Sequence, residues 1–213
     1  MKKYIFDLDG TLLNAHWNEE DEFFRSILPI DQAIKFEDER VDLIYGYEEN
    51  YPRYDIYNLS RWFMDHGYNI NTSKINEWIH FNGDIMGNDM CDGVIELLED
   101  IKSRDGEIVL LSNWFNYTQI NRLKRSGLYE YFDDFVTGDM ELKPYLESYR
   151  LAASFTPFNE CMMIGDNYVK DYYKPLMYGM NAYFVDENHG LRELIGGDAN
   201  DRRCKTKIKT RFE

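Results

Sequence analysis

The stretch that most constrains the fold lies near the start of the chain, where a short apolar run ends in two aspartates. Tyr4 to Phe6 is typical of a buried strand, and Asp7 and Asp9 have the spacing that places both side chains on one side of an extended backbone. Gly10 then interrupts the strand. In an open α/β sheet, ligands bind at the carboxyl ends of strands, so the aspartate pair indicates a site. Aspartates before a glycine are also common in turns and helix caps, which leaves a purely structural role open.

A segment with helical periodicity follows the aspartate pair. Over residues 15–89 the apolar residues recur with helical spacing, and no convincing strand is present. Three helices are expected: the first has Asn18 as its N-cap and Phe23, Phe24, Ile27 and Leu28 on one face, the second carries Ile56, Leu59 and Phe63 and stops at Gly67, and the third follows Thr72 and carries Ile75, Trp78 and Ile79. The pattern predicts a small all-helical unit.

From Asp92 onward, helices and strands alternate. Apolar runs typical of buried strands cover residues 108–111, 135–137, 161–164 and 182–185. Between them, Asp92 is expected to cap a helix that ends by Gly106, a second helix stops at Gly127, and Pro144 is expected at the first position of a third. Strands separated by helices form parallel sheets, so the sequence predicts an α/β fold with a Rossmann-like parallel-sheet core.

Polar side chains follow three of these strands and would meet at one edge of the sheet. They comprise Asp7 and Asp9, Ser112 and Asn113, and Asp166, with Asp171 one turn further on and Lys143 on a nearby loop. Clustered carboxylates repel one another, whereas a hard divalent cation such as Mg²⁺ prefers oxygen ligands. A hydroxyl and an ammonium suit the oxygens of a phosphoryl group. The set indicates phosphoryl transfer, although Ser112 and Asp166 could be helix caps and Lys143 a surface lysine.

Composition restricts the partners and the compartment. The formal net charge of -15 over 213 residues argues against a broad nucleic-acid surface. The cysteines are Cys91, Cys161 and Cys204, an odd number without metal-ligand spacing, so reduced thiols are expected. The first apolar run stops too soon for a signal peptide, and no later run approaches the length of a membrane span. We expect a cytoplasmic protein whose partner is a small phosphorylated metabolite, without nucleic acid or membrane.

Four motifs of this chain together resemble those of the haloacid dehalogenase superfamily. In order and at suitable distances they are Asp7-Leu8-Asp9-Gly10-Thr11, Leu111-Ser112-Asn113, Lys143-Pro144 and the stretch from Gly165 to Asp171. The resemblance implies a core formed by residues 1–14 and 90–213, with residues 15–89 as a small helical cap inserted after the first motif.

The resemblance also implies a role for each motif residue. Asp7 would be the nucleophile, and Asp9 the acid that protonates the leaving oxygen and then activates water. Mg²⁺ would be bound by the carboxylates of Asp7 and Asp166 and the backbone carbonyl of Asp9, with help from Asp171. Ser112, together with Asn113 and Lys143, would bind the phosphoryl group, and Lys143 would neutralise charge on Asp7. These roles predict an Mg²⁺-dependent phosphatase of small phosphate monoesters that acts through an aspartyl-phosphate intermediate.

The motif residues also bear on other activities of the same superfamily. Members that cleave carbon–halogen bonds lack the second aspartate of the first motif, which is present here as Asp9. Phosphonate-cleaving relatives also replace it and use a cap lysine, for which Lys35 and Lys74 are the candidates. A sugar-phosphate mutase keeps all four motifs and stays open as an alternative. So does a non-catalytic ligand-binding or regulatory protein that retains the site.

Two further regions carry weaker expectations. The predicted cap is rich in tyrosine and arginine, and Arg40, Arg53 and Tyr54 are candidates for contacts with the leaving group of a substrate. The chain ends in a basic stretch beyond Gly197, for which a solvated surface is the favoured interpretation over a nucleic-acid-binding arm.

Overall fold

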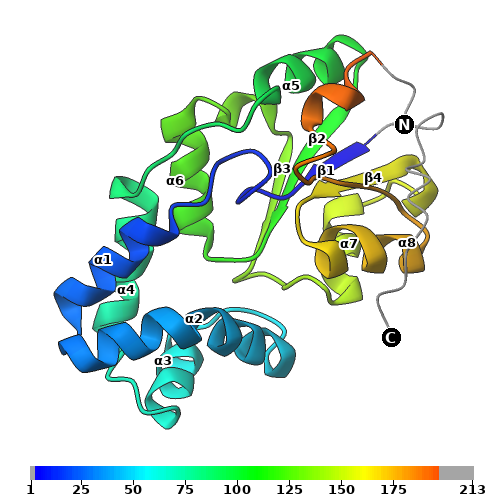
Figure 1. Cartoon of the computed structure of the whole chain (residues 1–213). Helices are drawn as coiled ribbons and strands as arrows, with labels where there is room; N and C mark the ends of the chain where they lie inside the picture. The colour runs from blue at the N-terminus through cyan, green and yellow to red at the C-terminus, as the bar shows by residue number, and fades with distance from the viewer. Residues whose placement is uncertain (1–2, 197–213) are drawn as a thin grey trace, which may run out of the picture.

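Five strands form one parallel sheet in the order β3-β2-β1-β4-β5, in a computed structural model that describes residues 3–196 (Figure 1). The strands are β1 (Lys3–Phe6), β2 (Glu107–Ser112), β3 (Asp134–Thr137), β4 (Cys161–Gly165) and β5 (Asn181–Phe184). In register, Phe6 of β1 pairs with Leu110 of β2 and Ile164 of β4. The first strand is therefore the central one, and the predicted α/β fold with a parallel sheet is confirmed.

The helices have the following bounds. In the first half of the chain lie α1 (Trp17–Ile27), α2 (Ile30–Asn50), α3 (Ile56–Asp65), α4 (Thr72–His80) and the π-helix η1 (Phe81–Ile85). The second half contains α5 (Val94–Ser103), α6 (Asn116–Ser126), α7 (Leu146–Ala153) and α8 (Lys174–Tyr178), the π-helix η4 (Tyr168–Tyr173), and the 3₁₀ turns η2 (Tyr129–Tyr131), η3 (Phe158–Glu160) and η5 (Leu191–Leu194).

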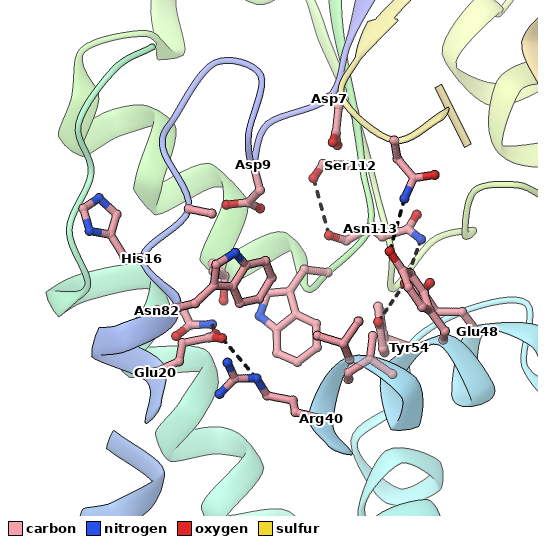
Figure 2. Close-up of a pocket in the computed structure, with 18 of the residues that line it drawn as sticks. Asp7, Asp9, His16, Glu20, Arg40, Glu48, Tyr54, Asn82, Ser112 and Asn113 are labelled. Carbon is pink, nitrogen blue, oxygen red and sulfur yellow. Dashed lines mark hydrogen bonds and ion pairs between the residues drawn. The ribbon is translucent and has the colours of Figure 1, made fainter. Parts of the chain in front are cut away.

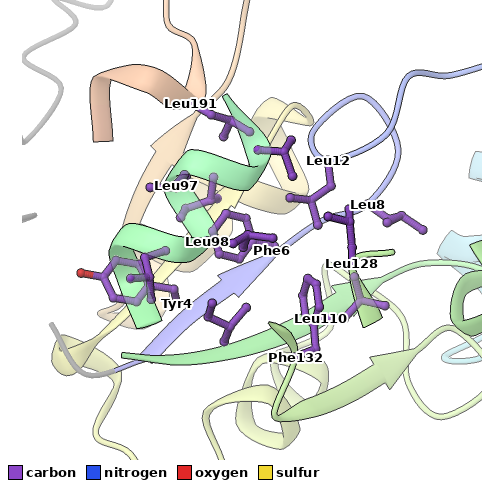
Figure 3. Packing of buried hydrophobic residues seen from close by; sticks show 14 of the residues in the cluster. Tyr4, Phe6, Leu8, Leu12, Leu97, Leu98, Leu110, Leu128, Phe132 and Leu191 are labelled. Carbon is purple, nitrogen blue, oxygen red and sulfur yellow. The ribbon is translucent and has the colours of Figure 1, made fainter. Parts of the chain in front are cut away.

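Both faces of the sheet are covered, because successive residues of each strand point to opposite sides. Tyr4 and Phe6 of β1 pack in one hydrophobic cluster with Leu98 of α5, as Figure 3 shows. Ile5, between them in sequence, belongs to a second cluster with Tyr149 of α7. This two-sided burial explains why the strands are continuous apolar runs and why their polar residues occur only at the ends.

The helices α1–α4 and η1 form a group beside the sheet, in the segment for which the sequence predicts a cap (Figure 1). We refer to residues 15–89 as the helical segment. Its apolar side chains make their own cluster, centred on aromatic rings: Phe36 lies 4.5 Å from Phe24 and 5.3 Å from Phe63 between ring centroids. The cluster also takes in Phe115 and Leu142 from the sheet-bearing part of the chain. The helical segment is therefore packed internally and against the loops at the end of the sheet.

The three helices expected in this segment correspond to α1, α3 and α4, but α2 was missed. Its buried side is formed by Ala33, Phe36, Arg40, Leu43 and Tyr47, which follow helical spacing with an arginine in the middle. The charged residue conceals the apolar pattern.

Three predicted helix starts are wrong. Helix α1 begins at Trp17, because the carbonyl of His16 already accepts hydrogen bonds from the backbone, so Asn18 lies inside the helix. Gly93, in the left-handed conformation at φ 80°, precedes α5, while the Asp92 carboxylate is bound by Arg192. Pro144 lies in a turn, and α7 begins two residues later, after an extended Tyr145.

The described residues also bear on the expectations for membrane spans and cysteines. Within residues 3–196, no helix combines the length and apolar character needed to cross a bilayer. Cys91 and Cys161 are free thiols. Cys204 and the basic stretch beyond Gly197 lie outside the described residues.

Removing apolar volume from the side of the sheet that α5 covers should destabilise the fold. Leu98 is fully buried, and Leu98→Ala is expected to lower the free energy of unfolding by about 2–5 kcal/mol, because the cavity it leaves cannot fully collapse. Leu151→Ala, at a partly exposed position of α7, is the matched control and should cost under about 1 kcal/mol. Urea unfolding measures both changes, and equal losses would contradict the packing described.

Candidate active site

Three carboxylates and one ammonium group meet at the carboxyl ends of β1 and β4 (Figure 2 shows Asp7). Oxygens of Asp7, Asp166 and Asp171 all lie within 4.8 Å of one another. The Lys143 Nζ lies 2.8 Å from the Asp7 carboxylate and donates to the Asp171 carboxylate at 2.7 Å. The structure therefore brings together four of the residues that the sequence places in the site.

Two glycines make this close approach possible. Gly10 has φ +71°, and a Cβ there would lie 2.2 Å from an Asp166 oxygen, so any other residue would displace that carboxylate. A Cβ at Gly165 would lie 2.4 Å from the Asp171 carboxyl carbon. The loops after β1 and β4 can converge only because both positions lack a side chain.

The charges in this cluster do not balance. Burial, followed by repulsion from Asp7 and Asp171, raises the pKa of Asp166 from 3.8 to about 7. Burial also raises the pKa of Asp171, although Lys143 opposes the shift. For Lys143, burial would lower the pKa, but attraction to Asp171 and Asp7 outweighs it and raises the pKa. A divalent cation would relieve the excess negative charge, and an all-oxygen donor set fits Mg²⁺.

Ser112 and Asn113 lie beside Asp7 at the end of β2. The Ser112 hydroxyl is buried and accepts a hydrogen bond from Gln119 at 2.8 Å. The Asn113 side chain is held at both ends, because its oxygen accepts from the Lys143 backbone and its amide donates to the Lys143 carbonyl. Asn113 thus fixes the loop that carries Lys143, a positioning contact that the sequence did not reveal.

The Asp9 side chain points away from Asp7 (Figure 2). It is bound by two residues of α6. Arg122, which is buried, forms an ion pair with one Asp9 oxygen, and Gln119 donates to the other at 3.3 Å. Sequence reasoning assigned no role to Arg122 or Gln119, because a polar residue on a predicted amphipathic helix gives no sign of which loop it will meet.

A cavity of about 270 Å³ extends from these residues into the helical segment. Of the predicted leaving-group contacts, Arg40 and Tyr54 line it, whereas Arg53 lies on the exposed surface. The candidate cap lysines lie on the surface too: Lys35 pairs with Glu39, and Lys74 donates to a backbone carbonyl. Most of the helical residues that line the cavity from this segment therefore belong to α2, while α1, α4 and η1 contribute fewer.

The sequence matches the profile of the haloacid dehalogenase-like hydrolases over residues 1–172, which is most of its length. The chain belongs to this hydrolase family. No curated protein matches the sequence.

Solved structures of low sequence identity share the fold of this hydrolase. The magnesium-bound haloacid dehalogenase-type hydrolase YfnB of Bacillus subtilis has a TM-score of 0.66 and 18% identity, over 91% of this chain and 96% of that one. A phosphatase of the same superfamily from Thermococcus onnurineus has a TM-score of 0.59 and 21% identity, over 93% and 100%. L-2-haloacid dehalogenase of Xanthobacter autotrophicus has a TM-score of 0.63 and 13% identity, over 88% and 80%.

One carboxylate links the helical segment of this hydrolase to the loops that carry Asn113 and the last motif. Glu48, near the end of α2, is buried and accepts hydrogen bonds from Tyr54 at 2.9 Å and from the Asn113 amide at 2.8 Å. It also forms an ion pair with Lys170, within the last motif. The sequence does not single out Glu48, because two of its partners, Asn113 and Lys170, lie 65 and 122 residues away along the chain.

Magnesium should stabilise the protein more at high pH than at low pH. The folded Asp166 keeps its proton up to about pH 7, whereas the unfolded chain loses it near 3.8, so the metal-free protein loses stability as pH rises through this window. Cation binding needs the deprotonated form and reverses the loss. Thermal unfolding should show a rise in Tm with Mg²⁺ of about 4 °C or more at about pH 8, and a smaller one at about pH 5.5.

The matched variants for this experiment are Asp166→Asn and Asp65→Asn. The first removes a carboxylate of the cluster and should abolish the effect of Mg²⁺ on Tm, while the second changes an exposed aspartate at the end of α3 and should preserve it. An equal rise in Tm at both pH values, or a rise that persists in Asp166→Asn, would contradict the assignment of the metal site.

Proposed function

We propose that this hydrolase is an Mg²⁺-dependent phosphatase that cleaves small phosphate monoesters through an aspartyl-phosphate on Asp7. The observation that carries the proposal is the position of Lys143, whose ammonium group lies 2.8 Å from Asp7 beside the paired carboxylates of Asp166 and Asp171. A carboxylate can attack an anionic phosphoryl group only where positive charge offsets their repulsion. Lys143 would supply part of that charge beside the Asp7 carboxylate, and a cation bound to the three carboxylates would supply the rest.

The reaction would proceed in two displacements on phosphorus. In the first, an Asp7 oxygen forms a bond to phosphorus, the ester P–O bond breaks, and the leaving oxygen takes a proton from Asp9. In the second, Asp9 takes a proton from water, the water oxygen attacks phosphorus, and the bond to Asp7 breaks to release phosphate. Because Arg122 and Gln119 hold Asp9 in the structure, proton transfer requires Asp9 to exchange the Arg122 contact for the substrate.

The metal would be held by the carboxylates of Asp7, Asp166 and Asp171, with the backbone carbonyl of Asp9 as a further ligand. Mg²⁺ bound there would supply charge neutralisation for the phosphoryl oxygens. Ser112 would donate to a phosphoryl oxygen while accepting from Gln119, which its single hydroxyl allows. The helical segment would act as a cap that excludes water from the intermediate.

Asp9 and the charges of the cavity favour this activity over the alternatives. A dehalogenase has no leaving oxygen to protonate, so Asp9 would serve no purpose there. A sugar-phosphate mutase must hold a second phosphate position on its substrate, which calls for free positive charge. Among the described residues that line the cavity, every basic side chain already has a carboxylate partner: His16, Arg40, Arg122, Lys143 and Lys170.

Release of phosphate from a panel of phosphate monoesters tests the proposal. We expect release that requires Mg²⁺, and a loss of at least about a thousandfold in kcat for Asp7→Asn, because the amide cannot form the intermediate. Asp65→Asn, far from the cluster, is the control and should keep wild-type activity. Phosphate release that persists in Asp7→Asn, or that is independent of metal, would overturn the proposed mechanism.

A further inference from the structure

The end of the cavity remote from Asp7 is formed by the helical segment and takes no part in the phosphoryl chemistry. Figure 2 shows Glu20, Arg40 and Asn82 at this end, separated from Asp7 and Ser112. They come from α1, α2 and η1. A leaving group attached to a phosphate at Asp7 would extend toward them.

The wall of the cavity between these ends is aromatic. Trp78 and Trp114 have ring centroids 4.4 Å apart, and Trp114 lies 5.0 Å from Tyr54 in an edge-to-face arrangement. Trp114 has φ 122°, a conformation that a residue with a side chain rarely adopts. Such strain persists only where surrounding structure imposes it, and it is concentrated at functional sites. The backbone after Asn113 thus presents an indole ring to the cavity at a cost in conformational energy.

Two buried polar atoms along this wall, the Asn82 oxygen and the Trp114 indole nitrogen, have no hydrogen-bond partner among the described residues. A third group, Arg40, is paired by charge with Asp21 at 2.8 Å and Glu20 at 3.7 Å, but its Nε and Nη1 make no hydrogen bond of acceptable geometry to the described residues. Arg40 is only 4% exposed and Asn82 only 5%. Buried groups are rarely left unpaired, because each costs about 1–3 kcal/mol, so these atoms indicate a ligand that supplies both an acceptor and a donor.

The charge of the remote end excludes an anionic ligand. Arg40 is opposed by both Asp21 and Glu20. Burial raises the pKa of Glu20, while Arg40 and hydrogen bonds from Trp78 and Asn82 lower it, and the raising effect prevails. A second phosphate or a carboxylate placed here would meet these acidic groups, and no basic side chain that lines the cavity within residues 3–196 is free to offset its charge.

We propose that the leaving group is an uncharged flat ring with a polar edge, and that the substrate class is nucleoside monophosphates. This inference rests on the proposed phosphatase function and adds its specificity. The base would lie against Trp114, with an acceptor on its edge for Arg40 or the Trp114 indole and a donor for the Asn82 oxygen. Trp114, Arg40 and Asn82 are thereby specificity-determining residues.

A matched pair of substrates tests the inference. Ribose 5-phosphate and the four common ribonucleoside 5′-monophosphates share the phosphorylated ribose and differ in the base. We expect kcat/KM for at least one nucleotide to exceed that for ribose 5-phosphate by about tenfold or more, from ring stacking and edge hydrogen bonds. The corresponding nucleoside diphosphate should be a poorer substrate than the monophosphate. Equal kcat/KM for ribose 5-phosphate and every nucleotide would overturn the inference while leaving the phosphatase proposal standing.

Substitutions of residues that line the cavity test which side chains produce the preference for a nucleotide over ribose 5-phosphate. Trp114→Gly removes the indole and also relieves the positive φ, so it should fold, and it should bring the ratio of kcat/KM between nucleotide and ribose 5-phosphate close to one. Asn82→Ala should lower the same ratio. Tyr57→Leu, at a largely exposed position of α3, is the control and should preserve the ratio. A ratio unchanged in Trp114→Gly would contradict the assignment.

Calorimetric titration separates this inference from the proposed function. The Asp7→Asn variant should bind the preferred nucleoside monophosphate at least about tenfold more tightly than ribose 5-phosphate, without any turnover. If no ester releases phosphate, the phosphatase proposal fails, and the titration alone decides whether the cavity takes a nucleotide. Equal or absent binding of both ligands would overturn the inference.

Discussion

The ion pairs of one buried lysine hold together the sheet edge that carries the candidate active site. Lys143 lies between Asp7 and Asp171, which follow different strands and would otherwise repel. Removing one partner of a buried charge cluster is strongly destabilising, because it leaves the other charges uncompensated. With Asp166, the cluster has three carboxylates and one ammonium group, an excess of negative charge that a bound cation would offset. The packing of this edge and the proposed chemistry therefore involve the same four side chains.

The α/β core could be predicted because its signals are local. Each buried strand is a continuous apolar run, and the alternation with helices leaves few topologies. The helical segment was harder, since α2 places Arg40 on its buried side, where a tertiary contact with Asp21 overrides the apolar pattern. Likewise, proline at position 144 is compatible with a helix start, yet the chain continues in a turn there because Asn113 holds the Lys143 backbone from another loop.

The sequence predicts those residues of the candidate site that lie at the ends of strands. Asp7, Ser112 and Asp166 could be placed together from topology alone. Their supporting residues could not, because Arg122, Glu48 and similar partners act across long sequence separations and look in sequence like ordinary polar positions of amphipathic helices. The positive φ of Trp114 is another property of the assembled fold, since no residue type at that position signals it.

In the proposed reaction, the Asp7 carboxylate becomes covalently bound to phosphorus during turnover. Acid quenching of the protein with a hydrolysable ester, followed by borohydride reduction and peptide mass spectrometry, detects such an acyl phosphate, because the reduction converts the modified aspartate to homoserine. We predict homoserine at position 7 in a metal- and substrate-dependent manner. An unmodified Asp7 under conditions of rapid phosphate release, or modification at another carboxylate, would contradict the account.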